Sequence, residues 1–182
     1  MADTLDMSAR AAATGAKGAD LIAATRETMR LATLGNMDYN KSLDAVIAMQ
    51  TAFNIKSSDM AKTTDFLNAV ENQTILSMQD MAVAVPRVAP VIKGLGGNVQ
   101  DLAVMMTALR QGGVSAEQGA NALKSGLGSL LNPTSTAIKQ FDGLGINLQK
   151  IVDTNKGDII GTLQGLGKAL DGLTKYDRQR AL

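Results

Sequence analysis

Cysteine and histidine are both absent from this chain of 182 residues. The absence of cysteine excludes a disulfide framework, a thiolate nucleophile and metal ligation by sulfur. The absence of histidine removes the side chain most often used as a general base and as a metal ligand. Serine hydroxyls remain, but a serine nucleophile needs a neighbouring base, and the sequence suggests none. We therefore expect no enzyme activity, no catalytic residue, no cofactor or metal site, and no small-molecule substrate.

Tryptophan is absent as well, and the other aromatic residues are two tyrosines and three phenylalanines. Aromatic side chains normally bury the largest apolar area per residue. The core must therefore come from leucine, isoleucine, valine, alanine and the ten methionines. Such a core is shallow, and it suits closely spaced helices that meet through small side chains. The length is enough for one domain or two small ones.

Strong charge and long apolar runs are also missing. The net charge is +1, and the densest basic group is Lys175, Arg178 and Arg180 near the end of the chain. This balance gives no electrostatic reason to expect a polyanionic ligand, so we do not expect nucleic-acid binding. Residues 125–138 form one of the longest uncharged stretches, about fourteen residues, whereas a membrane-spanning helix needs roughly 20 apolar residues.

The distribution of helix formers and helix breakers indicates an all-α fold. The first 35 residues are rich in alanine, the strongest helix former, and Gly35 can end that segment as a C-cap. Pro86 and Pro90 would interrupt a strand ladder and fit a first helical turn or a kink. We predict an array or bundle of short capped helices joined by Gly, Pro and Asn turns. Its expected divisions are an N-terminal helical segment, 1–35, and a helical core region, 36–182.

A helix-start signal recurs along the chain. It consists of a serine or asparagine followed three residues later by an acid or an amide, which is close to a capping box. The pairs are Ser77 with Asp80, Asn98 with Asp101, and Ser115 with Gln118. Their spacing of roughly twenty residues leaves two interpretations open, an internal repeat of one helix and one turn or independent short helices with ordinary caps.

Apolar residues at helical spacing form three candidate packing or interaction faces. Each face fits either the inside of a helical core or a contact with a partner protein. The third face lies in a glycine-containing segment, and glycine inside a helix costs roughly 1 kcal/mol relative to alanine, so that helix needs a partner to hold it. The three faces are Leu102, Met105, Met106 and Leu109; Leu123 and Leu127, continued by Leu130 and Leu131; and Leu163, Leu166, Leu170 and Leu173.

Two loops resemble ligand-binding motifs only superficially. Residues 153–158 have acids at both ends, but the segment lacks the fifth-position ligand and the terminal glutamate of a calcium loop. We interpret it as a polar turn. Residues 94–97 are glycine-rich, but the Gly-Lys-Ser/Thr ending of a phosphate loop is missing. We interpret this segment as the end of one helix and the cap of the next.

The turns and helix caps from residue 90 to residue 146, and those that follow, occur in a specific order, and this order is more informative than any one of them. It resembles the core region of phage tail tape measure proteins, over roughly residues 36–182. One departure is Gly119-Ala120, where the family usually has Ala-Gly. The segments that carry the resemblance are Met37-Asp38-Tyr39, Pro90 to Leu95, Gly97-Asn98, Asp101-Leu102-Ala103, Ala108-Leu109, Gly113-Val114, Gln118 to Lys124, Leu130 to Thr134, Leu144-Gly145-Ile146, and Lys156-Gly157-Asp158 to Leu173.

This resemblance implies a structural and assembly role in a phage or prophage tail. The whole protein would set tail length during assembly and assist genome delivery. Expected partners are other copies of the chain in a homo-oligomer, tail tube and tail-tip proteins, tail assembly chaperones and, during ejection, the host membrane. The expected locations are the lumen of the virion tail and, during assembly, the host cytoplasm. Family members are much longer, so the resemblance implies a fragment truncated at its C-terminal end.

Two other classes of function compete with this expectation. A membrane-active or pore-associated helical protein would fit the Gly- and Ala-rich amphipathic segments, but the apolar helices lack the basic face typical of such proteins. A wall-cleaving enzyme occurs as an added domain in the family, but it requires a catalytic set that this sequence does not display.

Overall fold

The computed structural model describes residues 18–173, together with Ala9 and Ala12. Every regular element in this part of the chain is a helix, which confirms the all-α prediction. The basic group at residues 175–180 and most of the first 17 residues lie outside the described residues. The elements are α2 (Ala19–Leu34), α3 (Tyr39–Phe53), a short 3₁₀ turn η1 (Ser57–Asp59), α4 (Met60–Gln73), α5 (Met78–Gly94), α6 (Val99–Gln111), α7 (Ala116–Leu131), α8 (Ser135–Gly143), α9 (Leu148–Thr154) and α10 (Ile159–Asp171).

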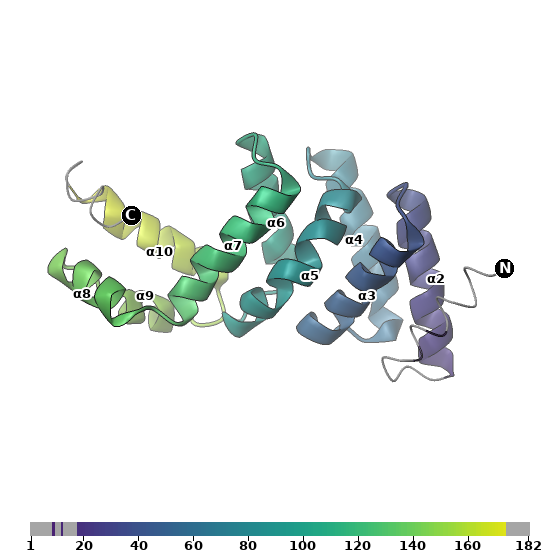
Figure 1. Cartoon of the computed structure of the whole chain (residues 1–182), viewed down its shortest axis with the longest axis horizontal. Coiled ribbons are helices and arrows are strands. Elements are labelled where there is room, and N and C mark those ends of the chain that lie inside the picture. Colours follow the sequence, from purple (N-terminus) through teal and green to yellow (C-terminus); the bar gives the residue numbers. More distant parts are fainter. Residues whose placement is uncertain (1–8, 10–11, 13–17, 174–182) are drawn as a thin grey trace.

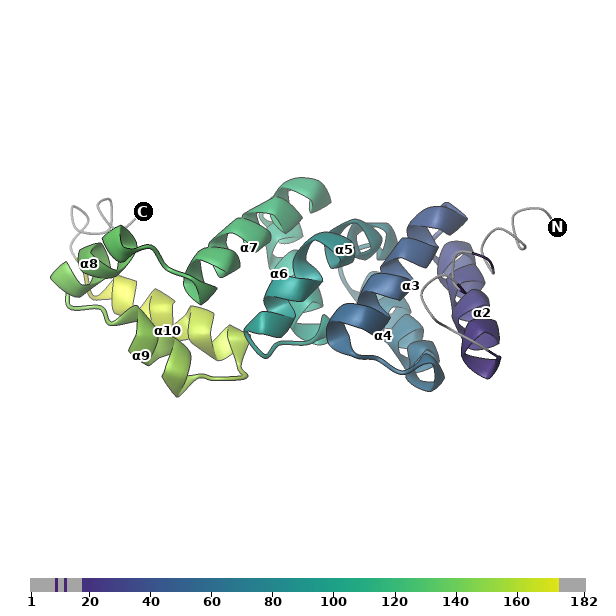
Figure 2. The ribbon, with the colours of Figure 1, turned by 60° about the horizontal axis from the view of Figure 1, so that its bottom comes forward.

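Helices α2 to α7 form an array in which the chain runs up and down in successive hairpins (Figure 1). Helices α3, α5 and α7 lie side by side in one layer, and α5 packs extensively against both neighbours. Helices α2 and α4 lie behind this layer in contact with each other, and α6 packs against α5 and α7. The three short helices α8 to α10 extend beyond the α7 end of the array (Figure 2). We refer to α2–α7 as the array and to α8–α10 as the C-terminal unit.

The three predicted helix starts are present with both hydrogen bonds of a capping box. At the start of α5, the Asp80 backbone N–H donates to Ser77 Oγ at 3.0 Å, and the Ser77 backbone N–H donates to Asp80 Oδ2 at 3.2 Å. The same reciprocal pair joins Asn98 to Asp101 and Ser115 to Gln118. Each box satisfies two N–H groups that have no partner inside the helix. The local sequence therefore determines where α5, α6 and α7 begin.

Four of the described helix connections share one backbone design. In each, a residue with positive φ follows the helix, and the next N–H donates back to a carbonyl five residues earlier, which is a Schellman motif. The residue after that is the N-cap of the following helix. The positive-φ residues are Asn36, Gly96, Gly113 and Gly145, and the returning hydrogen bonds run from Met37 to Ala32, Gly97 to Ile92, Val114 to Leu109 and Ile146 to Phe141.

These four corners clarify the repeat that the sequence suggested. They join α2 to α3, α5 to α6, α6 to α7 and α8 to α9. Three of these connections join consecutive helices of the array, and the fourth lies within the C-terminal unit. The connection before Ser77 has a different backbone, because Thr74 there is extended. What recurs in the chain is therefore this corner, which is present in both the array and the C-terminal unit.

Helix α5 continues through two prolines. Pro86 and Pro90 cannot donate backbone hydrogen bonds, and neither lies in the first helical turn, where proline is best tolerated. Both rings are exposed, whereas Val85 and Val88 on the other side of the helix are fully buried. The side chain of Arg87 donates from Nη1 to the carbonyl of Val83 at 2.7 Å, next to the interrupted hydrogen-bond ladder. Burial between α3 and α7 thus maintains a helix that local propensity would end.

The apolar core runs through the array and is centred on α5, which buries eight of its residues. Methionines fill much of it, including Met49, Met60 and Met106, each with no exposed surface. Helix α2 shares this core through Leu31, and Arg30 of α2 forms an ion pair with Asp65 of α4. The boundary predicted at residue 35 falls at the α2–α3 corner, but α2 packs with the helices that follow it. Division into two domains stays a prediction.

Candidate interaction surfaces and family membership

The first predicted face, on α6, is directed into the array. Leu102 and Met106 are fully buried and Met105 is nearly so, whereas Leu109 is half-buried. Leu109 lies against α7 at Gly119, where an added Cβ would come within 3.2 Å of Leu109 Cδ1. The absence of a side chain at Gly119 therefore allows α6 and α7 to approach closely. Three of these four side chains are inaccessible to a partner in this conformation.

The second predicted face, on α7, also packs against the core. Leu127 is buried, and Leu123, Leu130 and Leu131 are half-buried against the same apolar cluster. Leu131 reaches α5 at Gly94, where an added Cβ would lie 3.0 Å from Leu131 Cδ1. This face therefore holds α7 onto the array and leaves only part of its apolar surface accessible.

The third predicted face, on α10, is the most accessible of the three. Leu163, Leu166, Leu170 and Leu173 are all half-buried. The small-residue side of α10 packs against α9, since an added Cβ on Gly165 would lie 3.3 Å from Ile151 Cγ2. Leu163 contacts the core cluster of the array, whereas Leu166 and Leu170 lie outside it. Contact of this face with a partner protein stays a prediction.

Three ion pairs between helices were not predicted from the sequence. Arg110 of α6 donates from Nε to Asp80 of α5 at 3.0 Å, and its Nη1 donates to the carbonyl of Val114 at 3.2 Å. Asp80 therefore caps α5 and also binds α6. The signals were an acid in a first helical turn and an arginine in a last turn, but only the packed helices show that the two meet.

The other two pairs join α5 to α7 and α2 to α4. Arg87 Nη2 lies 3.1 Å from Glu117 Oε1, at the start of α7. Arg30 binds Asp65, and this hydrogen bond with the Asp65 carboxylate raises the pKa of Arg30. Glu27, next to Arg30 on α2, is 3% exposed, and its Oε2 has no hydrogen-bond partner; both nearby arginines stand 3.7 Å away. The Arg110–Asp80, Arg87–Glu117 and Arg30–Asp65 pairs therefore connect neighbouring helices, whereas the Glu27 contacts lie within α2.

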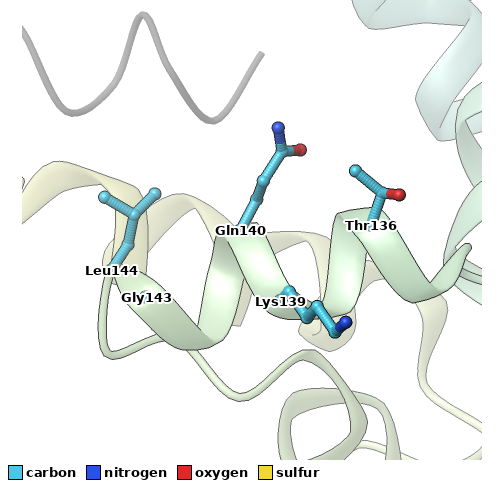
Figure 3. Close-up of a pocket in the computed structure, with 5 residues that line it drawn as sticks. All are labelled: Thr136, Lys139, Gln140, Gly143 and Leu144. Atoms are coloured by element: carbon cyan, nitrogen blue, oxygen red, sulfur yellow. The ribbon is translucent and has the colours of Figure 1, made fainter.

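The largest described hollow is a groove of about 850 Å³ over α5, between the starts of α3 and α7. Its floor includes Ala82, Val83 and Pro86. Its charged rim is largely paired within the chain, because Arg87 binds Glu117 and Asp38 caps α3. A second hollow, about 300 Å³, lies along α8 (Figure 3). There Gln140 and Thr136 point to one side of the helix and Lys139 to another, so these groups do not converge on a common point.

The residues considered for metal and phosphate binding have structural partners. Asp158 caps α10 by accepting from the Gly161 N–H at 2.8 Å, and Asp153 accepts from Gln149 at 3.0 Å. The glycine-rich segment 94–97 forms the α5–α6 corner, as predicted. Across residues 18–173, no three His, Cys, Asp or Glu side chains gather in a way that could hold a metal ion. The helices in this range are also too short or too polar to span a membrane.

Comparison with known proteins places the chain among phage tail proteins. It is 25% identical over 155 residues to the tape measure protein of Pneumococcus phage Dp-1, an alignment that covers 84% of this chain and 13% of that protein. It is also 25% identical over 124 residues to the probable tape measure protein of Escherichia phage P2, covering 68% of this chain and 15% of that protein. The chain thus spans a small part of the length of either relative.

No solved structure matches the chain. The family of phage-related minor tail proteins matches it from residue 1 to residue 182. Because this match covers the whole sequence, the chain belongs to the family of phage-related minor tail proteins.

Proposed function

We propose that this chain is a jointed helical segment of a phage tail tape measure protein, with a structural and assembly role in the virion tail. The observation that carries the proposal is the family match over all 182 residues, together with tape measure proteins among the relatives. A structural role is also supported by the described ion pairs and caps, which connect helices and do not converge on a reaction centre.

The proposed segment differs from a simple helical ruler. A straight α-helix advances about 1.5 Å per residue, so a helical ruler sets length through its number of residues. Here the longest described helix has 17 residues, and the chain reverses direction repeatedly within the array. We infer that the segment is a folded, jointed module attached to the part of the protein that measures the tail. The whole protein would set tail length and assist genome delivery.

The proposed partners follow from the same role. They are other copies of the chain, tail tube and tail-tip proteins, and assembly chaperones in the host cytoplasm, with the host membrane as a contact during ejection. The half-buried leucines on α10 offer the most accessible apolar surface among the three predicted faces. Leu170→Glu should therefore reduce the molar mass measured by light scattering if this face mediates self-association. An unchanged oligomer in this variant would assign self-association to another surface.

The function is tested by placing matched substitutions in the tape measure gene of a phage that carries this segment. Leu102→Asp puts a carboxylate at a position with no exposed surface, whereas Val104→Asp changes a neighbour on the same helix that is 57% exposed. We expect Leu102→Asp to reduce the number of assembled tails seen by electron microscopy and Val104→Asp to leave it close to wild type. Equal numbers of normal tails in both variants would contradict a role of the folded module in assembly.

Tail length distinguishes a folded, jointed module from a ruler. A phage in which the C-terminal unit is deleted should make tails of wild-type length or fail to make tails. If this segment were part of the ruler, the tails would instead shorten by about 1.5 Å for each residue removed. Proportional shortening would overturn the proposed module while leaving the chain's membership of the family intact.

A further inference from the structure

The connection between the array and the C-terminal unit is narrow. Among the described helices, those of the C-terminal unit touch those of the array only slightly. Every such contact is smaller than the contact between α8 and α9 or between α9 and α10. The covalent link is the short segment from Asn132 to Thr134, between α7 and α8. Both overall views show the start of α10 beside the α5–α6 corner (Figures 1 and 2).

Two glycines meet at this corner. Gly96 in the α5–α6 corner has φ +84°, and Gly157 before α10 has φ +88°. A Cβ added to Gly96 would lie 2.6 Å from the Cα of Gly157 and 3.2 Å from its nitrogen. This is closer than any side-chain carbon can sit, so the two backbones pack directly against each other. The contact depends on the absence of a side chain at Gly96.

One fully buried side chain anchors the contact, and Ile160 and Leu163 of α10 pack half-buried against the same apolar cluster. Ile159, the first residue of α10, is 1% exposed and belongs to the apolar cluster of the array. Its Cγ2 atom would lie 3.2 Å from a Cβ added to Gly97, so it fills the space beside that glycine. The rest of the unit is more open, since α8 buries none of its described side chains and α9 buries Leu148 alone.

We propose that the C-terminal unit, α8–α10, can separate from the array while the chain stays continuous. The Gly96–Gly157 contact and the Ile159 anchor hold the unit against the array, and residues 132–134 are the hinge about which it rotates when this contact opens. Local opening is cheapest where few apolar side chains are buried, and hinges lie in short connections at the ends of elements. Opening at this joint separates a small interface and leaves the α5-centred core intact. It converts the folded segment into two bodies on one chain without unfolding the array. This conformational step is independent of the proposed role in the tail.

Gly96→Ala tests the joint, and Gly113→Ala is its matched control. Gly113 occupies the equivalent position in the α6–α7 corner, with φ +80° and no atom within 4 Å of an added Cβ. Both substitutions strain the backbone equally, so their difference isolates the contact with Gly157. We expect amide hydrogen exchange in residues 135–171 to be about tenfold faster or more in Gly96→Ala than in Gly113→Ala, because overpacking forces the contact apart. Exchange in α3 and α5 should be equal in the two variants.

A second pair of variants tests the separation of the C-terminal unit from the array if Gly96→Ala disturbs folding. Ile159→Ala removes the fully buried anchor, and Ile160→Ala truncates a neighbour of the same size that is only half-buried against the same cluster. We expect faster exchange in α8–α10 in Ile159→Ala than in Ile160→Ala, again with α3 and α5 unchanged. If α3 and α5 lose protection together with α8–α10 in these variants, the chain opens as one cooperative body and the proposal is wrong.

Label distances provide an independent measurement, since the chain contains no natural cysteine. Cysteines introduced at Val104 on α6 and Ile138 on α8, both exposed, can carry spin labels. The distance distribution between the labels should broaden when Gly96→Ala is added and should not broaden when Gly113→Ala is added. The same distribution in all three proteins would show that the Gly96–Gly157 contact does not hold the unit in place.

Discussion

The array and the C-terminal unit use the same corner but differ in how their helices are supported. Helix α6 lies between two Schellman corners and buries five residues, and α8 is followed by the same corner but buries none. The array also has ion pairs between its helices, such as Asp80 with Arg110, whereas the Asp153–Gln149 hydrogen bond of the unit lies within α9. Local sequence therefore specifies helices in both regions. The regions differ in the burial of side chains between helices, which is extensive in the array and small in the C-terminal unit.

The largest expected difference between the two regions comes from the same substitution made in each. Leu102→Ala in the array empties a fully buried site and should lower the free energy of unfolding by about 2–5 kcal/mol. Leu170→Ala in the unit truncates a half-buried side chain outside the core cluster and should lower it by about 1 kcal/mol. Urea denaturation followed by circular dichroism measures both. Equal losses would mean that the unit is as well packed as the array.

A smaller effect is expected from the charged connection between α5 and α6. Asp80→Ala removes the return bond of a capping box and the partner of Arg110, so we expect a loss of about 1.5–3 kcal/mol. Asp101→Ala removes the return bond of the next capping box, where no ion pair is involved, and should cost less. A double-mutant cycle of Asp80→Ala with Arg110→Ala should give a coupling of at least about 0.5 kcal/mol. Additive effects would show that the ion pair contributes nothing beyond the cap.

The smallest effects are expected from the N-caps, and they should differ in extent between the two regions. Ser115→Ala removes the cap of α7 and should lower the global free energy of unfolding by about 1 kcal/mol. Asn147→Ala removes the cap of α9, where the Asn147 side chain accepts from the Lys150 N–H at 2.7 Å. Its effect should appear as faster hydrogen exchange within the unit, with little change in the unfolding of the array. A global loss from Asn147→Ala would contradict the separation of the two regions.

The features predicted correctly from the sequence are those determined by neighbouring residues. The caps at Ser77, Asn98 and Ser115 and the helix end at residues 94–97 depend on side chains and backbone angles within a few positions. The course of α5 through Pro86 could not be predicted in the same way, because burial between α3 and α7 overrides local propensity there. The meeting of Gly96 with Gly157 involves residues far apart in the chain and has no local signal.

The predicted apolar faces also show that local sequence patterns do not determine which residues meet in the fold. Helical spacing identified the apolar stripe of Leu102, but spacing alone leaves open whether a stripe faces the core or a partner. The structure directs that stripe inward and leaves Leu166 and Leu170 half-buried. The family resemblance, in contrast, came from the order of the turns, and the match over the whole chain confirms it.

We infer that this segment is a folded, jointed module and not a straight helical ruler. Small-angle X-ray scattering of the chain tests it most directly through the radius of gyration. A compact globule of this length has a radius of gyration of about 16 Å, and an elongated array should exceed that value by a few ångströms. A single straight helix, at about 1.5 Å per residue, would give about 80 Å. We predict a value of roughly 20–25 Å, and a value approaching that of the straight helix would contradict the folded, jointed module.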